Sequence, residues 1–181
     1  MKATGIVRRI DDLGRIVIPK EIRRTLRIRE SDPLEIFTDR EGEIILKKYS
    51  PIEEMSTSAK QCAESLAQVS GHVAVVADRD QFIAVAGGYK NLMGKSISRQ
   101  LEERLGTRET VTAAKGDRNF IVVCEDVSDE YQHQTIAPII SEGDVIGAVI
   151  LLEADSKGKM GEVEQKLALS SAGFLGRQME Q

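Results

Sequence analysis

The chain has 181 residues, of which 41% are hydrophobic and 30% charged, and its formal net charge at pH 7 is −4. This composition is ordinary for a protein that folds in water, and no apolar run approaches the roughly 20 residues needed to cross a bilayer. The first residues lack the apolar core of a signal peptide, so we expect a cytoplasmic protein without a membrane partner.

Positive charge is concentrated near the N-terminus. Residues 8–29 contain eight Lys and Arg against three Asp and Glu, a net of +5. Residues 1–50 have a net charge of +3 and residues 51–181 a net charge of −7. Positive charge gathered on one segment predicts a polyanion partner, most commonly nucleic acid. We predict two domains, 1–50 and 51–181, with Ser50 as the N-cap and Pro51 as the first residue of a helix.

The first domain has the pattern of a small β-rich unit. We expect strands at 4–10 and 15–18, a turn from Asp11 to Gly14, a short helix at 20–26 after Pro19, and a hairpin of 34–37 with 43–46. A segment of about 50 residues without a disulfide or metal is marginal as a monomer. The simplest resolution is an obligate dimer that completes one β core from two chains.

Residues 4–37, TGIVRRIDDLGRIVIPKEIRRTLRIRESDPLEIF, closely resemble the AbrB-type swapped-hairpin transition regulators of spore-forming bacteria. The shared theme is a strand, D-x-L-G-R, V/I-V/I-I-P and then E-I/L-R-R-x-L. The resemblance implies a small β-barrel of two interleaved chains that presents arginines to duplex DNA. By position, the DNA-contacting arginines of that family match Arg8, Arg15, Arg23 and Arg24, and Arg9 stands where the family tends to be basic.

The second domain begins with a helical pattern whose apolar residues are spaced three and four apart. They are Ile52, Met55, Ala59, Cys62, Leu66 and Val69. This heptad-like seam permits two interpretations, in which the helix either pairs with its counterpart in the dimer or packs on its own domain. We then expect strands at 72–77, 81–86 and 120–124, helices at 97–105 and 161–180, a polar loop at 106–118, and a hairpin of 135–140 with 145–152.

This order of elements predicts an α+β domain, with a central antiparallel sheet flanked by helices. The stretches APIISEGDVIGAVIL (137–151) and NLMGKSI (91–97) resemble the GAF sensor domains, which are related to PAS domains. Such domains often hold a small molecule, but we assign no ligand-binding residues, and a purely oligomerising role is the alternative. The combination of the two domains resembles a family of sporulation regulators of the developing forespore, and this implies a tetramer built as a dimer of dimers.

We therefore expect a DNA-binding transcriptional regulator of sporulation, acting as activator and repressor. The alternative is an antitoxin that neutralises a partner toxin, since some antitoxins share the swapped-hairpin domain. The two cysteines and two histidines have no metal-ligand spacing, and no catalytic triad or nucleotide motif stands out. We expect no metal, no cofactor and no enzymatic activity.

Overall fold

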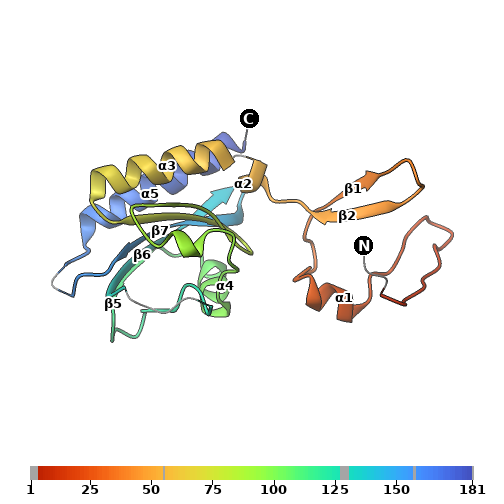
Figure 1. Cartoon of the computed structure of the whole chain (residues 1–181), viewed down its shortest axis with the longest axis horizontal. Coiled ribbons are helices and arrows are strands. Elements are labelled where there is room, and N and C mark those ends of the chain that lie inside the picture. Colours follow the sequence, from red (N-terminus) through yellow and green to blue (C-terminus); the bar gives the residue numbers. More distant parts are fainter. Residues whose placement is uncertain (1–3, 55, 127–130, 157, 181) are drawn as a thin grey trace. The chain divides into compact units, whose positions relative to one another are not determined.

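The computed structural model describes residues 4–54, 56–126, 131–156 and 158–180. The chain divides into two compact units, Met1–Tyr49 and Ser50–Gln181 (Figure 1). Within the described ranges, no helix is long and apolar enough to span a membrane.

The first unit contains one short helix and one hairpin. They are α1 (Lys20–Thr25), β1 (Leu34–Thr38) and β2 (Ile44–Lys48). The two strands are antiparallel, with Leu34 opposite Lys48. Asp39 shapes the turn between them, because its carboxylate accepts hydrogen bonds from the amides of Glu41 (3.0 Å) and Glu43 (2.8 Å). The predicted helix and hairpin are therefore confirmed.

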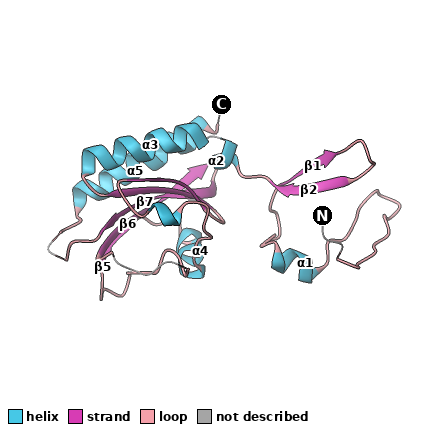
Figure 2. Ribbon diagram, in the orientation of Figure 1, coloured by secondary structure: helices cyan, strands magenta, loops and turns pink. Residues whose placement is uncertain are grey.

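The two strands predicted at 4–10 and 15–18 are wrong for this structure. Residues 4–19 form neither strand nor helix (Figure 2). Within this segment the backbone forms a hydrogen-bonded loop from Asp11 to Arg15. A β-strand is stable when its backbone groups pair with a neighbouring strand, and the described part of the chain provides no such neighbour for this segment. A pattern of β-branched residues favours a strand but does not supply its partner.

The second unit is built on a five-stranded antiparallel sheet with the strand order β4-β3-β7-β6-β5. The strands are β3 (Val73–Asp78), β4 (Phe82–Ala86), β5 (Val111–Ala114), β6 (His133–Ser141) and β7 (Asp144–Glu153). The helices are α2 (Pro51–Glu54), α3 (Ser56–Ser70), η1 (Lys90–Leu92), α4 (Arg99–Gly106) and α5 (Glu162–Gln178). Helices α3 and α5 lie side by side over one face of the sheet, and α4 lies on the other (Figure 1).

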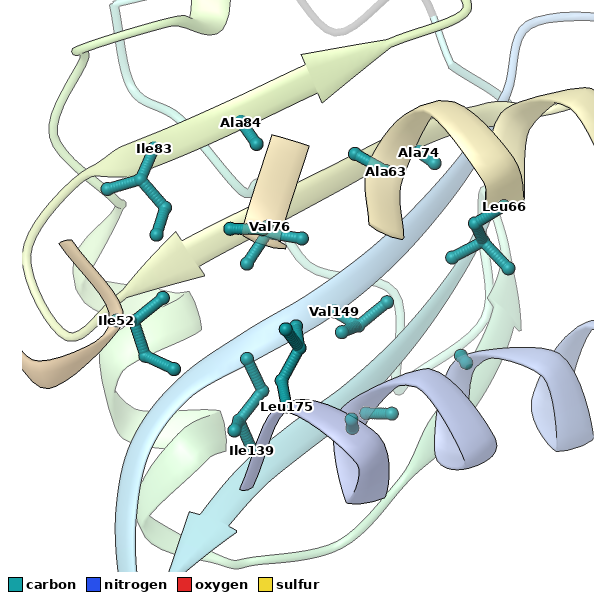
Figure 3. Packing of buried hydrophobic residues seen from close by; sticks show 14 of the residues in the cluster. Ile52, Ala63, Leu66, Ala74, Val76, Ile83, Ala84, Ile139, Val149 and Leu175 are labelled. Atoms are coloured by element: carbon teal, nitrogen blue, oxygen red, sulfur yellow. The ribbon is translucent and has the colours of Figure 1, made fainter. Parts of the chain in front are cut away.

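The sheet buries both of its faces, which explains the nearly continuous apolar runs of β3 and β7. Successive side chains of a strand point to opposite faces. Val76 and Val149 accordingly join the core beneath α3 and α5, whereas Val75 and Ile150 join the core on the α4 side. Figure 3 shows the first of these cores, in which Val76 and Val149 of the sheet lie near Leu175 of α5.

Glycine permits the closest approach between α5 and the sheet. A Cβ atom added at Gly176 would collide with the carbonyl oxygen of Ile140 in β6. A neighbouring glycine, Gly173, has only the tip of the Arg177 side chain near its missing Cβ, with Nη1 at 3.5 Å. The position of α5 on β6 therefore depends on the missing side chain of Gly176 and not on the other glycine of this helix, Gly173.

Two expectations for the second unit are wrong. The stretch 106–118, expected to be a polar loop, contains β5, in which Val111 pairs with Ile136 of β6. The stretch 120–124, expected to be a strand, lies outside the sheet. The β5 sequence VTAA is short and is flanked by charged residues, so its apolar pattern is weak. Pairing with the long strand β6 decides its conformation.

Side chains satisfy the backbone groups of 120–124 in place of a neighbouring strand. Tyr131 Oη accepts from the amide of Val123 (2.9 Å) and donates to the carbonyl of Ile121 (3.2 Å). Gln100 accepts from the amide of Val122 (3.0 Å). In the amide orientation that satisfies both of its partners, the buried Gln134 donates to the carbonyl and accepts from the amide of Ile121, each at 2.9 Å.

The seam that begins at Ile52 packs mainly on its own domain. Ile52, Ala59 and Leu66 are buried in the core beneath α3 and α5. Cys62 is half-buried and Val69 is exposed, while Met55 lies outside the described residues. Pro51 begins α2 as predicted, and the hydroxyl of Ser50 donates to Asp78 Oδ2 (2.8 Å).

Candidate nucleic-acid interface

Helix α1 carries two of the predicted DNA-contacting arginines. Pro19 precedes the first residue of the helix with φ −57°, a value that its ring enforces, and the first turn contains the acidic Glu21. Arg23 and Arg24 occupy the last turn, where positive charge is favourable toward the helix dipole. Arg24 is exposed, whereas Arg23 is half-buried and its Nε donates to the carbonyl of Ile18 (3.3 Å).

The C-terminus of α1 is closed by a residue that is not glycine. The amide of Ile28 donates to the carbonyl of Arg23 (2.7 Å) and the amide of Arg27 donates to that of Arg24 (3.3 Å), as in a Schellman motif. Arg27 has φ +52°, a left-handed conformation that glycine usually occupies in this motif. Arg27 therefore adopts a backbone conformation that is strained for a residue with a Cβ atom.

Arg15 lies at the end of a tight loop organised by Asp11. Oδ1 of Asp11 accepts from the amides of Leu13 (3.1 Å) and Arg15 (2.8 Å). Oδ2 accepts from Nε of Arg15 (2.8 Å). The amide of Arg15, followed by its guanidinium, lowers the pKa of Asp11 from its ordinary value of 3.8. Gly14, with φ +77°, completes the reversal of the chain.

Arg8 and Arg9 lie N-terminal to this loop in the segment without regular structure, and both are exposed. The structure thus places Arg8, Arg9, Arg15 and Arg24 at the surface of the first unit. The side chain of Arg23 is instead hydrogen-bonded to the backbone just before α1. The predicted site residues are therefore accessible to a partner, except for the half-buried stem of Arg23.

A buried carboxylate fixes the loop after α1 to the hairpin. Asp32 Oδ2 accepts from the amide of Arg29 (2.8 Å) and lies 3.1 Å from Nζ of Lys48 in β2. Burial raises the pKa of Asp32, but the Arg29 amide and the Lys48 ammonium outweigh it, so the pKa lies below 3.8. Nζ of Lys48 also donates to the carbonyl of Arg27 (3.0 Å), which ties the end of α1 to the same strand.

The first unit exposes a large part of its apolar surface. Among its described residues, 4–49, none is buried as a whole residue, although the side chain of Asp32 is only 4% exposed. Val7 is 89% exposed, and the exposed side chains include Ile10, Val17, Ile36 and Ile44. A fold of this size that exposes so many large aliphatic side chains has no core of its own.

A groove with a volume of about 490 Å³ separates α3 from α5 in the second unit. Its walls include Ser58, Cys62, Ser65 and Val69 of α3 and Leu167, Ser171 and Phe174 of α5. Burial raises the pKa of the Cys62 thiol, against a smaller opposite effect of the Ser171 hydrogen bond. None of the described side chains that line this groove is charged. Cys62 and Val69 belong to the heptad-like seam, so the sequence contained part of the signal for this groove.

Two family models match the chain. Residues 7–54 match the model described as "Antidote-toxin recognition MazE, bacterial antitoxin". Residues 54–180 match the model described as "Stage V sporulation protein T C-terminal, transcription factor". The second model covers more than half of the chain, and the first covers the arginine-rich unit.

The chain also resembles curated relatives and solved structures. The GAF domain of the Acinetobacter phosphoenolpyruvate-protein phosphotransferase covers 69% of this chain and 81% of its own, with a TM-score of 0.57 and 14% identity, which confirms the GAF-type fold. The transition state regulatory protein AbrB of Bacillus subtilis (strain 168) is 45% identical over 101 residues, which are 56% of this chain and 85% of AbrB. Stage V sporulation protein T of the same organism is 53% identical over 182 residues, which cover 100% of both chains. The chain therefore belongs to the stage V sporulation protein T family of transcription factors.

Proposed function

We propose that the first unit binds duplex DNA through Arg8, Arg15, Arg23 and Arg24, with Arg9 as a supporting contact. The observation that carries this proposal is the net charge of +5 over residues 8–29, displayed on a unit whose arginines are mostly exposed. Closely spaced like charges repel one another, and binding to phosphate removes that repulsion. Arginine also presents a planar fork of donors that fits phosphate and guanine edges.

The DNA-binding form is proposed to be a dimer of first units. The exposed aliphatic side chains of residues 4–17 and of the hairpin would be buried against a second copy, which would complete one β core. Burial of apolar surface stabilises by about 25 cal/mol per Å², so surface of this kind is a strong driving force for pairing. Pairing would also double the number of arginines and give the protein the two-fold symmetry that suits paired half-sites.

The second unit is proposed to join dimers into a tetramer through the α3–α5 surface. Val69 is 70% exposed and Phe174 is 48% exposed beside the uncharged groove. Two copies of this helix pair can meet about a two-fold axis through their uncharged grooves and form a four-helix bundle. Phe174→Glu should abolish the tetramer in light scattering and leave the dimer. An intact tetramer would contradict this role of the groove.

The finer biological assignments follow from the family. We propose that the chain acts in the cytoplasm of the developing forespore, where it activates some promoters and represses others. A small-molecule signal sensed by the GAF-type unit belongs to the same proposal, with no residue assigned to it. A change in the thermal unfolding temperature of the full chain on adding a candidate metabolite would support such a signal.

The test of DNA binding is fluorescence anisotropy of the full-length chain. The probe is a duplex selected by the protein from a random-sequence pool, and an unrelated duplex of equal length is the comparison. Alanine at Arg8, Arg15, Arg23 or Arg24 should weaken binding to the selected duplex. For each variant that loses a phosphate contact, the salt slope should fall by about 1. The control is Arg40→Ala, which removes one exposed charge from the β1–β2 turn.

Equal losses for Arg40→Ala and for the four site variants would show that only net charge matters. Wild-type binding by all four variants would overturn the site assignment. Circular dichroism and light scattering on each variant show whether the fold and the oligomeric state are retained.

The antitoxin function is a second candidate, favoured by the family model that matches residues 7–54. Antitoxins of this kind carry a disordered tail that wraps a toxin, whereas the second unit here has a packed sheet and two buried clusters. Co-purification of a small basic protein in fixed stoichiometry with the native chain would support the antitoxin function. A homogeneous homo-oligomer would support the transcription factor alone.

A further inference from the structure

We propose that Asp11 is a positioning residue for DNA binding, which holds the guanidinium of Arg15 ready for its contact. This inference rests on the proposed function, in which Arg15 touches DNA. Asp11 is negatively charged. By charge alone, it should repel the phosphate backbone and weaken DNA binding.

The two carboxylate oxygens of Asp11 have separate partners. Oδ1 accepts from the backbone amides of Leu13 and Arg15 and so fixes the loop. Oδ2 accepts from Nε of Arg15 at 2.8 Å and so fixes the side chain. The backbone closes the same loop, because the amide of Asp11 donates to the carbonyl of Arg15 (3.0 Å) and the amide of Gly14 donates to that of Asp11 (3.0 Å). Five hydrogen bonds thus lie within the five residues from Asp11 to Arg15.

The pair is exposed, which makes a purely stabilising role weak. The side chain of Arg15 is 69% exposed and that of Asp11 is 38% exposed. Exposed ion pairs contribute little to stability because water screens them and because holding two side chains costs entropy. Here the bond uses Nε, so the two terminal nitrogens of the guanidinium can still donate to a phosphate or to a guanine.

The advantage of this arrangement is preorganisation. A free arginine side chain loses its rotamer freedom when it binds DNA, and that loss weakens binding. Asp11 restricts Arg15 before DNA arrives, so the loss at binding is smaller. Removing this restriction should weaken binding about two- to tenfold, as expected for one immobilised side chain.

The decisive variant is Asp11→Asn. A positioning role and a mere negative charge near DNA predict opposite changes in DNA affinity. Asparagine keeps an oxygen for the amides of Leu13 and Arg15, and it removes the negative charge that faces Nε of Arg15. If Asp11 positions Arg15, the variant should bind the selected duplex about two- to tenfold more weakly. If Asp11 is only a charge near DNA, the variant should bind more tightly. Asp12→Asn is the matched control, since it removes an exposed charge from the neighbouring residue and should not weaken binding.

A double-mutant cycle separates this inference from the proposed function. Arg15→Ala should weaken binding, and adding Asp11→Asn to it should weaken binding no further. The same should hold in the Arg15→Lys background, because lysine keeps the charge but lacks both Nε and the fork. Wild-type binding by Arg15→Ala would overturn the role of Arg15 and this inference together. Weaker binding by Arg15→Ala, with unchanged or tighter binding by Asp11→Asn, would overturn the inference alone.

Discussion

Nδ1 of His72 lies 2.6 Å from Oε2 of Glu153, and this contact joins the start of the sheet to its last strand. On the other side of the ring, Nε2 lies 3.7 Å from Oε1 of Glu164 in the first turn of α5. Glu164 also accepts from the amide of Gly161 (2.6 Å), which caps the helix. One half-buried imidazole, on the residue just before β3, therefore connects the end of β7 and the beginning of α5.

The pH dependence of this connection has a definite sign. The amide of Asp155, followed by His72, lowers the pKa of Glu153 below 4.5, although burial opposes the shift. Burial raises the pKa of Glu164, but the Gly161 amide and His72 outweigh it, so this pKa also lies below 4.5. A carboxylate with a lowered pKa adds stability above its ordinary value, and that stability is lost as the pH falls through the lowered value.

We therefore predict that Glu153→Gln lowers the unfolding temperature at pH 6 and that the difference from wild type is progressively lost as the pH falls below the ordinary value of 4.5. Differential scanning calorimetry from pH 2 to 7 measures this difference. Glu162→Gln, an exposed neighbour at the start of α5, is the control and should follow wild type. A constant difference at every pH would show that the lost stability does not depend on the charge of Glu153.

Gly176 and Gly173 provide a matched pair in α5. Gly176→Ala should destabilise the second unit by about 1–3 kcal/mol or more, because the new methyl group would collide with the backbone carbonyl of Ile140. Gly173→Ala should instead raise stability by roughly 0.5–1 kcal/mol, the usual gain of alanine over glycine in a helix. Urea unfolding followed by circular dichroism compares the two. Equal effects would mean that the close approach of α5 to β6 is not important.

Asp32 should stabilise the first unit through charge. Asp32→Asn keeps an acceptor for the Arg29 amide but loses the pairing with Lys48, and we expect a loss of about 1.5–3 kcal/mol at pH 7. The folded-state pKa of Asp32 lies below its ordinary value of 3.8, so this loss should diminish as the pH falls below that value. Hydrogen exchange of the β1–β2 amides measures it, with the exposed Glu30→Gln as the control. The same loss at every pH at which the unit is folded would contradict a role of the charge.

The segment 120–124 should loosen when one hydroxyl is removed. Tyr131→Phe keeps the ring packed against Phe120, whose centroid is 5.4 Å away, and deletes the bonds to Val123 and Ile121. The amide of Val123 should then exchange faster, with a cost near 1 kcal/mol. The amide of Val76 in the central ladder is the internal reference and should keep its rate. Unchanged exchange at Val123 would show that the hydroxyl bond is dispensable.

The fold was predictable where local pattern and global packing agree. The strands around Val75 and Ile150 are apolar throughout because both faces of the sheet are covered, and their runs were recognisable. The hairpin of β1 and β2 was recognisable from its turn residues. By contrast, the sequence pattern predicted a loop where β5 lies and a strand at 120–124, and both predictions were wrong. The conformations of both segments are decided by distant partners, namely β6 and the side chains of Gln134 and Tyr131.

The sequence predicted the positively charged residues of the candidate site but not the role of the negatively charged Asp11. Arg8, Arg15, Arg23 and Arg24 stood out by type and number, and the structure leaves most of them accessible. Asp11 looked only like a turn residue, because its bond to Nε of Arg15 depends on the geometry of the folded loop. The left-handed conformation of Arg27 was not predicted either, since it is expected at glycine or asparagine and not at arginine.

The stretch 120–124 has a consequence for how this chain can vary. A strand inside a sheet obtains its hydrogen bonds from the backbone of its neighbour, which nearly every residue type supplies. This stretch obtains most of them from particular side chains, including those at positions 100, 131 and 134, so substitutions there act on a distant piece of backbone. Those positions should tolerate fewer substitutions than their burial alone suggests, and a change at one of them should free a single amide while its neighbours stay protected.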